Sequence, residues 1–466
     1  MKQNTYSRLR FIISFGLIIL ALASVWFFWR PGTKSSNQPK ASSYVTRSGS
    51  YLMLGGRSFR FSGANISWLG LQENPSVSYP SHFEVDDALA TAAFMGTTVV
   101  RSHTLGISTG CSLCVEPSLD QFNQIALQHI DYAIQSARLH HIKLIIPLTD
   151  NWHFYHGGKH DFTDWRWLPD ENQFYSNPLV IKDFKQYISV ILNHVNIYNG
   201  IAYKNDPTIL AWETGNELSA PSTWVQSIAS YIKSIDHHHL VMDGNYEQNG
   251  ESSNFLADLK IPNIDIYTGH YYPPDIFSFQ IQLQQAVMAR KVFIVGEYDW
   301  NTNSGSELSN FLSVIQYSAA AGDMYWSLFP HADQYGYVQH REHYTLHFPG
   351  DTPDMRKRVS ILLTHAYAMQ GKPVPRAELP GRPYITFDTG NAIAWRGAVD
   401  AATYTVERST VSGDGPWDVI CDRCATDNDT PWIDVSRSAG PAWYRVRAYT
   451  VTDIAGPFSN VYFSTW

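Results

Sequence analysis

The chain has 466 residues, of which 44% are hydrophobic, and 34 Lys and Arg stand against 42 Asp and Glu. This length is too great for one ordinary domain and predicts two folded domains. The charge is mildly acidic and no basic cluster is present, which argues against nucleic acid as a partner. The 15 Trp and 27 Tyr residues suit stacking on sugar rings, although most large aromatic side chains serve the core of any domain.

The N-terminal segment predicts targeting to a membrane. Three basic residues precede an unbroken apolar run from Phe11 to Trp29, which is long enough to cross a bilayer as a helix. We interpret residues 1–30 as a signal anchor, with cleavage as a signal peptide as the alternative. Residues 31–43 would form a flexible linker. The rest of the chain would then be extracellular, either secreted or tethered to the cell membrane.

Short apolar runs alternate with helical stretches between residues 44 and 372. Ile125 to Leu139, for example, carries apolar residues at helical spacing. Eight runs qualify as strands, namely 59–66, 97–102, 143–148, 208–212, 240–243, 265–270, 292–296 and 323–328. We therefore predict an α/β fold, a (β/α)8 TIM barrel over residues 44–372. An open doubly wound sheet is disfavoured because no glycine-rich phosphate loop follows the first run.

The pattern changes after Gly371. Residues 373–383 are rich in proline and predict a linker, while residues 384–466 contain short alternating runs separated by Gly, Pro and Asp clusters. Such runs predict a small all-β immunoglobulin-like sandwich. Residues 404–408 and 443–447 resemble strands of a fibronectin type III domain. A spacer or docking partner is favoured over a sugar-binding module because no exposed row of aromatic residues is evident.

The four cysteines form two C-x-x-C pairs, Cys111 with Cys114 and Cys421 with Cys424. Two local disulfides are the favoured interpretation for an exported protein, because oxidising conditions promote closure. One alternative is a four-thiolate zinc site, which would require the two domains to meet at these loops. The other is a redox-active pair.

Two glutamates follow apolar runs predicted as the fourth and seventh strands. Glu217 ends the stretch from Thr208, and Glu297 follows the run from Val292 to Gly296. Since the carboxyl ends of barrel strands share one rim, these carboxylates would converge there. Such a pair suits hydrolysis of a glycosidic bond, with retention at about 5 to 5.5 Å separation and inversion at roughly 6.5 to 9.5 Å. Arg101 ends the second strand and would bring a fixed cation to the same rim.

Several histidines raise the question of a metal. They are His103, His140, His141, His153, His156 and His160. No pair of them at i, i+4 on one helix is backed by a carboxylate, so we interpret them as residues that hydrogen-bond in loops or contact sugar. We therefore predict neither a metal nor another cofactor.

Two long motifs carry a resemblance to a known family. They are Tyr203 to Ile209 followed by Trp212-Glu213 and Asn216-Glu217, and Asp150-Asn151-Trp152 followed by Tyr155 and Gly157-Gly158. From about residue 50 to 330 the chain resembles glycoside hydrolase family 5, and most closely its endo-β-1,4-mannanases. The sequence departs from the usual pattern of that family at Gly215, at Leu218 and at residues 298–300.

The resemblance implies roles for individual residues. Glu217 would be the acid/base and Glu297 the nucleophile of a retaining double displacement. Arg101 would pair with the nucleophile and Asn216 would bind the substrate 2-hydroxyl. The further residues implied in substrate binding or its support are His270, Tyr272, Asn151, and, for stacking, Trp152, Trp300 and Trp326.

The sequence therefore predicts a monomeric endo-β-1,4-mannanase that acts on mannan-type polysaccharides. A β-1,4-glucanase and an exo-β-mannosidase are the alternatives that keep this fold. A non-catalytic carbohydrate-binding protein of the cell surface is the alternative from a different functional class.

Overall fold

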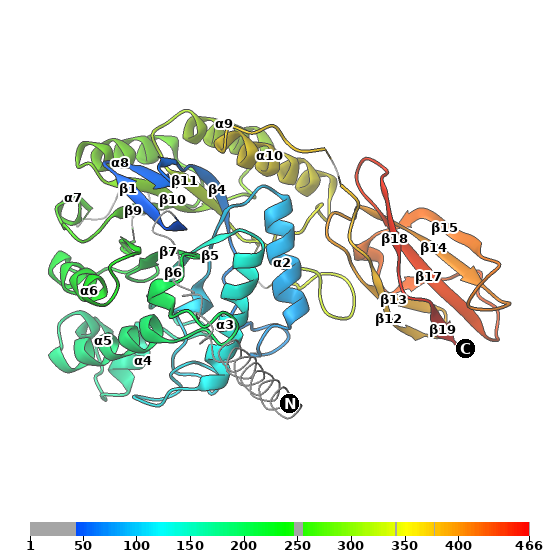
Figure 1. Ribbon diagram of the computed structural model, residues 1–466, viewed down its shortest axis with the longest axis horizontal. Helices are drawn as coiled ribbons and strands as arrows, with labels where there is room; N and C mark the ends of the chain where they lie inside the picture. Colours follow the sequence, from blue (N-terminus) through cyan, green and yellow to red (C-terminus); the bar gives the residue numbers. More distant parts are fainter. Residues whose placement is uncertain (1–42, 247–254, 341–342, 377, 466) are drawn as a thin grey trace, which may run out of the picture. The chain divides into compact units, whose positions relative to one another are not determined.

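A computed structural model of the protein describes residues 43–246, 255–340, 343–376 and 378–465. Its central feature is a closed barrel of parallel strands in the order β10-β11-β4-β5-β6-β7-β8-β9, with a helix after each strand (Figure 1). The strands are β4 (Phe61–Asn65), β5 (Val99–Arg101), β6 (Lys143–Pro147), β7 (Ile209–Glu213), β8 (Leu240–Met242), β9 (Ile266–Tyr271), β10 (Val292–Asp299) and β11 (Gly322–Trp326). The helices are α2 (His82–Phe94), α3 (Gln124–Leu139), α4 (Lys159–Asp164), α5 (Pro178–Asn193), α6 (Ser222–Ile235), α7 (Phe255–Asp258), α8 (Ile276–Met288), α9 (Gly305–Gln316) and α10 (Pro353–Met369).

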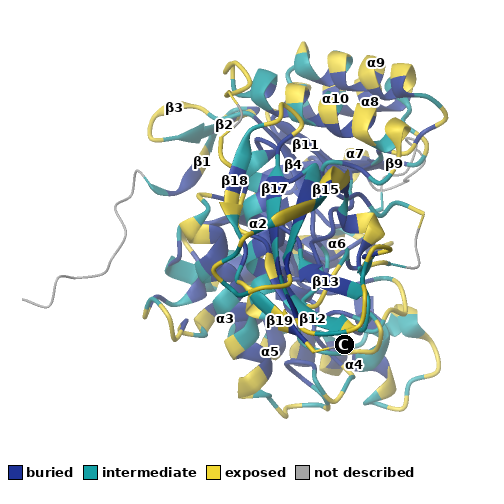
Figure 2. Ribbon diagram, turned by 90° about the vertical axis from the view of Figure 1, so that its right-hand side faces the viewer, coloured by how far each residue is buried: buried dark blue, intermediate teal, exposed yellow. Residues whose placement is uncertain are grey.

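The predicted (β/α)8 barrel is confirmed, and each of the eight predicted runs overlaps one strand. The runs were visible in the sequence because these strands are buried on both faces, as the fully buried β4 and β7 illustrate. Each surrounding helix buries one face. In α6, for example, the buried positions Trp224, Val225, Ile228 and Ile232 follow helical spacing, and Figure 2 shows the opposite faces of the helices exposed.

A small antiparallel sheet precedes the barrel and was not predicted. It consists of β1 (Val45–Ser48), β2 (Tyr51–Leu54) and β3 (Arg57–Ser58). Val45 and Leu52 join an apolar cluster with Phe61, Val99 and Val292, the first residues of three barrel strands. This sheet therefore closes the amino-terminal end of the barrel, opposite the rim at which the glutamates were expected.

After α10 the described residues form strands and one short 3-10 helix, Asp427–Asp429, and we call this region the β-domain (Figure 1). Its strands are β12 (Tyr384–Thr389), β13 (Ala392–Arg396), β14 (Thr403–Ser409), β15 (Asp418–Ala425), β16 (Trp432–Ile433), β17 (Ala442–Tyr449), β18 (Ala455–Phe458) and β19 (Tyr462–Ser464). One sheet contains β12, β13 and β16, and the other is built around β14 and β17. Side chains including Trp395, Tyr404 and Tyr444 form a core of their own.

The all-β character of the C-terminal region is confirmed, whereas its immunoglobulin-like and fibronectin type III identity is not. The predicted limits at residues 372 and 384 stay predictions, and the barrel and the β-domain belong to one compact unit. Disulfide bonds join Cys111 to Cys114 and Cys421 to Cys424. The predicted anchor, residues 1–30, lies outside the described residues, and among those described no helix has the length and apolar character needed to cross a membrane.

Candidate active site

An open cleft of about 310 Å³ lies at the carboxyl ends of the barrel strands. Its walls consist of His103, Trp152, Phe154, Asn216, Glu217, Tyr246, Tyr272, Glu297, Trp326 and Tyr344. Both predicted glutamates thus reach one cavity, together with several aromatic rings. Of the predicted substrate-binding residues, Trp152, Asn216, Tyr272 and Trp326 lie in the wall of this cleft with the two glutamates.

Glu297 lies within a strand and not after one, which corrects the expectation from sequence. Strand β10 continues to Asp299, and its register against β9 shifts between Val295 and Glu297. A side chain at Gly296 would come within 2.3 Å of the Thr268 hydroxyl and 2.8 Å of the His270 ring. Glycine is therefore needed for this irregularity, which brings Glu297 opposite His270 in the β9 pairing.

Arg101 is fully buried and holds Glu297 from below. Its Nη1 donates to Glu297 Oε1 at 2.7 Å, while its Nε and Nη2 donate to the two carboxylate oxygens of Glu213 at 2.7 and 3.1 Å. Nη2 also donates to Asn216 Oδ1 at 2.8 Å. On the other side, the Tyr272 hydroxyl donates to Glu297 Oε2 at 2.9 Å. Both oxygens of Glu297 are therefore fixed by hydrogen-bond donors.

Glu217 has a different setting, on a loop four residues after the end of β7. Its backbone adopts φ 51°, in the left-handed region that non-glycine residues seldom occupy. The amide of the next residue, Leu218, donates to the Gly244 carbonyl at 2.8 Å and thereby ties the loop to the end of β8. The His270 Nδ1 lies 2.8 Å from Glu217 Oε1, and the Trp152 indole donates to Oε2.

The two glutamates approach each other closely. One oxygen of Glu217, one oxygen of Glu297 and one ring nitrogen of His270 all lie within 4.8 Å of one another. The His270 Nδ1 is also 3.6 Å from Glu297 Oε2, so the ring faces both carboxylates. His270 is therefore placed to donate a hydrogen bond to one carboxylate while its ring lies near the other.

The electrostatic setting of the site follows from burial and from these carboxylates. Burial opposes the charge of Arg101, but Glu213 and Glu297 outweigh it and raise the pKa of the guanidinium. Burial also opposes protonation of His270, and Glu297 and Glu217 again prevail and raise its pKa. For Tyr246, burial and then the same two glutamates raise the pKa to about 12, so its hydroxyl keeps its proton.

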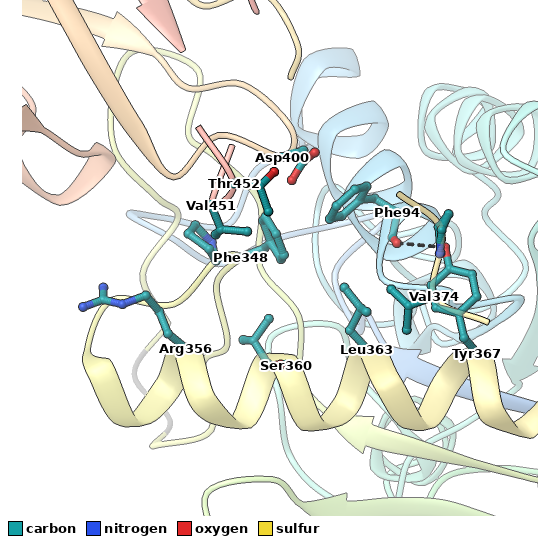
Figure 3. Close-up of a pocket in the computed structure, with 13 residues that line it drawn as sticks. Phe94, Phe348, Arg356, Ser360, Leu363, Tyr367, Val374, Asp400, Val451 and Thr452 are labelled. Atoms are coloured by element: carbon teal, nitrogen blue, oxygen red, sulfur yellow. Dashed lines mark hydrogen bonds between the residues drawn. The ribbon is translucent and has the colours of Figure 1, made fainter. Parts of the chain in front are cut away.

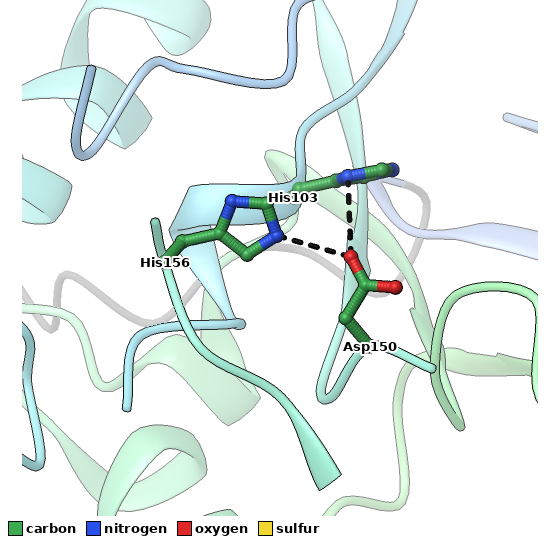
Figure 4. Close-up of side chains that lie close together, drawn as sticks. All are labelled: His103, Asp150 and His156. Atoms are coloured by element: carbon green, nitrogen blue, oxygen red, sulfur yellow. Dashed lines mark hydrogen bonds and ion pairs between the residues drawn. The ribbon is translucent and has the colours of Figure 1, made fainter. Parts of the chain in front are cut away.

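His103, Asp150 and His156 form a second polar group beside the cleft (Figure 4). Their potential ligand atoms lie within 4.8 Å of one another, which also suits a metal. However, Asp150 Oδ2 is 3.0 Å from His156 Nε2, and Asp150 Oδ1 accepts from the Asn216 amide at 3.1 Å. Burial and the adjacent Arg101 lower the pKa of His103 well below its usual value. These contacts describe a hydrogen-bonded support for Asn216.

Four predicted site residues do not line the cleft: His270, which lies against both glutamates from strand β9, and Trp300, Asn151 and Arg101. Trp300 is 2% exposed and belongs to the core, where its indole donates to the Tyr344 carbonyl at 2.6 Å. Asn151 accepts from Lys159 Nζ at 2.6 Å. Arg101 is enclosed beneath Glu297 and contacts the carboxylate, not the cavity. The sequence motifs place Trp300 near a strand end and Asn151 in a loop, but they do not predict the direction of either side chain.

The sequence reasoning missed several residues that build the site. Glu213 pairs with Arg101, and a signal for it existed, because a buried guanidinium with five donors requires more than one carboxylate. Phe154, Tyr246 and Tyr344 lie on loops with no strand pattern to place them. Of these, Tyr344 lies between β11 and α10, after the last barrel strand, and its ring centroid is 5.3 Å from that of Tyr272.

A family profile described as "GH family 5 beta-mannosidase-like" matches residues 42–301, more than half of the chain. The chain belongs to this family. Membership of the GH family 5 beta-mannosidase-like proteins makes it a glycoside hydrolase and agrees with the resemblance found in its strand motifs.

Relatives and solved structures agree with this family. Mannan endo-1,4-beta-mannosidase 7 of Arabidopsis thaliana is 30% identical over 277 residues, which are 53% of this chain and 62% of the relative, under two thirds of its length. Mannan endo-1,4-beta-mannosidase 4 of Solanum lycopersicum is 27% identical over 62% of this chain and 80% of the relative. The endo-1,4-beta-mannanase structure from Rhizomucor miehei covers 71% of this chain and 100% of its own, at 26% identity and a TM-score of 0.59.

A further structure bears on the fold alone. The endo-beta-1,4-mannanase from Thermotoga petrophila is 19% identical, with a TM-score of 0.60, and covers 89% of this chain and 99% of its own. This share of the chain extends beyond the barrel. The likeness in fold therefore includes part of the β-domain.

Proposed function

We propose that this protein is a retaining endo-β-1,4-mannanase that hydrolyses β-1,4-mannosidic bonds in mannan-type polysaccharides. The observation that carries the proposal is the approach of Glu217 and Glu297 within 4.8 Å in a cleft lined by aromatic rings. Retaining enzymes hold their carboxyl groups about 5 to 5.5 Å apart, whereas inverting enzymes leave roughly 6.5 to 9.5 Å for a water molecule. The observed approach supports direct attack by one carboxylate.

In the first step, Glu297 attacks the anomeric carbon of the sugar. The glycosidic C–O bond breaks, an ester forms between Glu297 and the sugar, and Glu217 gives its proton to the leaving oxygen. In the second step, water adds to the anomeric carbon, Glu217 takes the proton of that water, and the ester bond to Glu297 breaks. Arg101 and Tyr272 support this assignment because their donors hold Glu297 in one orientation for attack.

Glu217 suits the acid/base role because it lies on the open side of the pair. Its two contacts come from different elements, His270 from strand β9 and Trp152 from the loop after β6, and they fix the carboxyl plane. The Asn216 side chain, held by Arg101 and Asp150, presents a fixed amide to the cleft. That amide is the proposed ligand of the 2-hydroxyl, and the half-buried Trp326 is the proposed stacking surface for the adjacent sugar ring.

Two observations favour an endo-acting mannanase over the alternatives. The relatives and the structure at 26% identity are named as endo-mannanases. The rings of Trp152 and Phe154 at the cleft are also 42% and 47% exposed, which leaves sugar-stacking surface beyond the reacting pair. A polymer could therefore extend past the glutamates in the cleft. The β-1,4-glucanase and the exo-β-mannosidase remain the alternatives that a substrate panel separates.

Release of reducing sugar from mannan, glucomannan and carboxymethyl cellulose, measured side by side, tests the substrate. We expect cleavage of mannan and glucomannan, with oligosaccharides as the early products. Cleavage of the cellulose derivative alone would contradict the mannanase assignment. Release of monosaccharide as the sole product would instead identify an exo-acting enzyme.

The substitution Glu297→Ala tests whether the cleft is catalytic or only binds carbohydrate. We expect turnover to fall by roughly 10⁴-fold or more, since the proposed nucleophile is removed, while affinity for mannan oligosaccharides is largely kept. Glu307→Ala, an exposed glutamate in the first turn of α9, is the matched control and should leave turnover unchanged. A wild-type protein that binds glycans but turns none over would support the binding-protein alternative.

We also propose an extracellular location, which the two disulfide bonds support because such bonds persist in oxidising compartments. The N-terminal membrane anchor and the monomeric state stay predictions from the sequence.

A further inference from the structure

Between β11 and α10, the described residues 327–340 and 343–352 carry part of the cleft wall, and we call them the rim loop. It begins directly after Trp326 and contains Tyr344, and both rings line the cleft. Backbone hydrogen bonds fold the loop back on itself. The Ser327 amide donates to the Tyr344 carbonyl at 3.0 Å, and the Leu346 amide donates to the Ser327 carbonyl at 3.0 Å. The loop therefore carries the Tyr344 ring and holds it next to the end of β11, where Trp326 lies.

The β-domain holds the rim loop through a buried ion pair. His331 of the loop lies between Asp87 of α2, at 2.9 Å from its Nδ1, and Asp427 of the β-domain, at 3.3 Å from its Nε2. All three side chains are buried. The Tyr404 hydroxyl donates to Asp427 at 2.8 Å and fixes that carboxylate within the β-domain. The loop is thus clamped between the barrel and the β-domain.

Neighbouring residues of the loop make further contacts with the β-domain. Arg396 Nε donates to the Asp333 carbonyl at 2.9 Å, and the Thr386 hydroxyl donates to the Gln334 carbonyl at 2.7 Å. The guanidinium of Arg396 also lies 4.2 Å from the centre of the Phe83 ring in α2. The two hydrogen bonds are made to backbone carbonyls of the loop and therefore restrain its backbone conformation.

The contact is also closely packed. A side chain at Gly397 would come within 2.2 Å of the His331 ring and 2.7 Å of Asp427, so the β-domain backbone presses directly on the ion pair. The Tyr337 ring stacks on His331 at 4.7 Å and on His347 at 4.3 Å. Its hydroxyl donates to the Phe348 carbonyl at 2.7 Å. Contacts therefore continue from Asp427 to the returning part of the loop, next to Tyr344.

Elsewhere the β-domain meets the barrel more loosely. A largely apolar cavity of about 270 Å³ separates α10 from the β-domain, and Figure 3 shows Leu363 and Tyr367 of α10 on one wall and Val451 and Thr452 on another. If the β-domain served mainly to stabilise the barrel, we would expect its tightest packing along this long helix. The tightest polar contact is instead at the rim loop.

We propose that the β-domain is a positioning element of the active site, in which Asp427, acting through His331, holds the rim loop so that Tyr344 lines the cleft beside Trp326. The expected effect on catalysis rests on the proposed glycosidase function, whereas the contact between the β-domain and the loop does not. It assigns the domain a role other than the spacer favoured from the sequence. Asp427 and His331 are positioning residues, since neither lines the cleft.

Asp427→Asn tests this role, with Asp388→Asn as the matched control. Asp388 accepts from Tyr462 and Ser464 inside the β-domain, so its replacement perturbs the domain without touching the loop. We expect Asp427→Asn to raise KM for mannan oligosaccharides and lower kcat/KM roughly 5- to 20-fold, an effect of the size found for coupling between sites. Amide hydrogen exchange should increase in residues 327–340 and 343–348. The control should change neither quantity.

Thr386→Val gives a milder version if Asp427→Asn does not fold, and should change the same quantities in the same direction by a smaller amount. The proposal is overturned if both variants match the control in loop exchange and in the ratio of KM to kcat. Loop exchange needs no substrate, so it still tests the positioning role if the wild type cleaves no mannan. In that case the proposed function fails, while hydrogen exchange still shows whether the β-domain holds the rim loop.

Discussion

Arg101 and His331 are both buried cations that lie between two carboxylates, yet they serve different ends. Arg101 joins Glu213 and Glu297 beneath the cleft, and His331 joins Asp87 and Asp427 between the barrel and the β-domain. The difference is that Glu297 opens onto a cavity whereas both partners of His331 are enclosed. A buried ion pair can thus belong to a candidate active site when one of its carboxylates faces a cavity open to substrate. When both carboxylates are enclosed, the ion pair only holds parts of the structure together.

The choice of cation fits each task. A guanidinium keeps its charge at any pH a protein survives, and its planar fork can serve several acceptors at once. Arg101 uses this fork to fix Glu213, Glu297 and Asn216 together. An imidazole can lose its proton, so the clamp at His331 depends on pH in a way that the site at Arg101 does not.

The largest effect within this comparison is expected for Arg101→Lys. An ammonium group keeps the charge but cannot reach both carboxylates and the Asn216 amide from one position. We expect kcat/KM on mannan to fall roughly 100-fold or more, because Glu297, the proposed nucleophile, loses its fixed geometry. Steady-state kinetics with circular dichroism as a folding check would measure this.

Arg166→Lys is the matched control, since Arg166 pairs with Asp183 away from the cleft and its side chain is 34% exposed. Its kcat/KM should stay near that of the wild type. If Arg101→Lys retains more than a tenth of wild-type kcat/KM, a positive charge alone is sufficient at this position. The claim that activity requires the planar guanidinium group would then be wrong.

A smaller effect, on stability, is expected at His331 as pH rises. Burial opposes its protonation, but Asp87 and Asp427 prevail and raise the pKa of His331 to about 10. Because this pKa lies above the usual value of about 6.5, the stabilisation is fully present below pH 6.5 and is lost as pH rises through about 10. The hydroxyl of Tyr404 and the ring of Tyr337 face the same group, and both tyrosine pKa values are raised well above their usual range by burial.

The measurement is the difference in melting temperature between wild type and His331→Gln across pH. We expect a difference of about 5 °C or more near pH 6, since removal of one partner leaves buried carboxylates unpaired, and a clearly smaller difference near pH 10.5. A difference that stays constant over this range would show that His331 contributes through packing and not through its charge.

Much of the barrel could be predicted from sequence, because strands buried on both faces leave continuous apolar runs. The same physics located the glutamates, since a run that ends on a carboxylate places it at the rim. The apolar runs could not predict the backbone conformation of the loop that carries Glu217. Strand β7 ends at Glu213, and the course of the following loop depends on contact with another strand end, where a side chain at Gly244 would come within 1.9 Å of the Gly215 carbonyl.

This contact also accounts for the two departures from the usual family pattern around Glu217. At Gly215 a side chain would come within 2.8 Å of Leu218 and Thr149, and Leu218 bonds to the Gly244 carbonyl. The contact between the rim loop and the β-domain could not be predicted at all. His331 and Asp427 are 96 residues apart, and nothing in a local pattern marks a pair at that distance.

Asp400 extends the comparison to a buried carboxyl that forms no ion pair with any of the described residues, and the expected effect there is the smallest. It is 4% exposed at the cavity beside α10, its Oδ2 has no hydrogen-bond partner, and burial, followed by Glu378, raises its pKa to about 7 (Figure 3). A folded-state pKa above the usual value of about 3.9 means that the folded protein favours the protonated form. Ionisation therefore costs stability increasingly as pH rises from about 4 to 7.

Asp400→Asn removes this cost, and asparagine tolerates the left-handed φ of 64° at this position. We expect the melting temperature to rise by about 2 °C at pH 8 and to change little at pH 4.5. Asp453→Asn is the matched control, because Asp453 has φ 62° but a side chain that is 70% exposed. A loss of stability at pH 8 in Asp400→Asn alone would mean that the ionised carboxylate is satisfied at the cavity, so that burial without a cation is tolerated there.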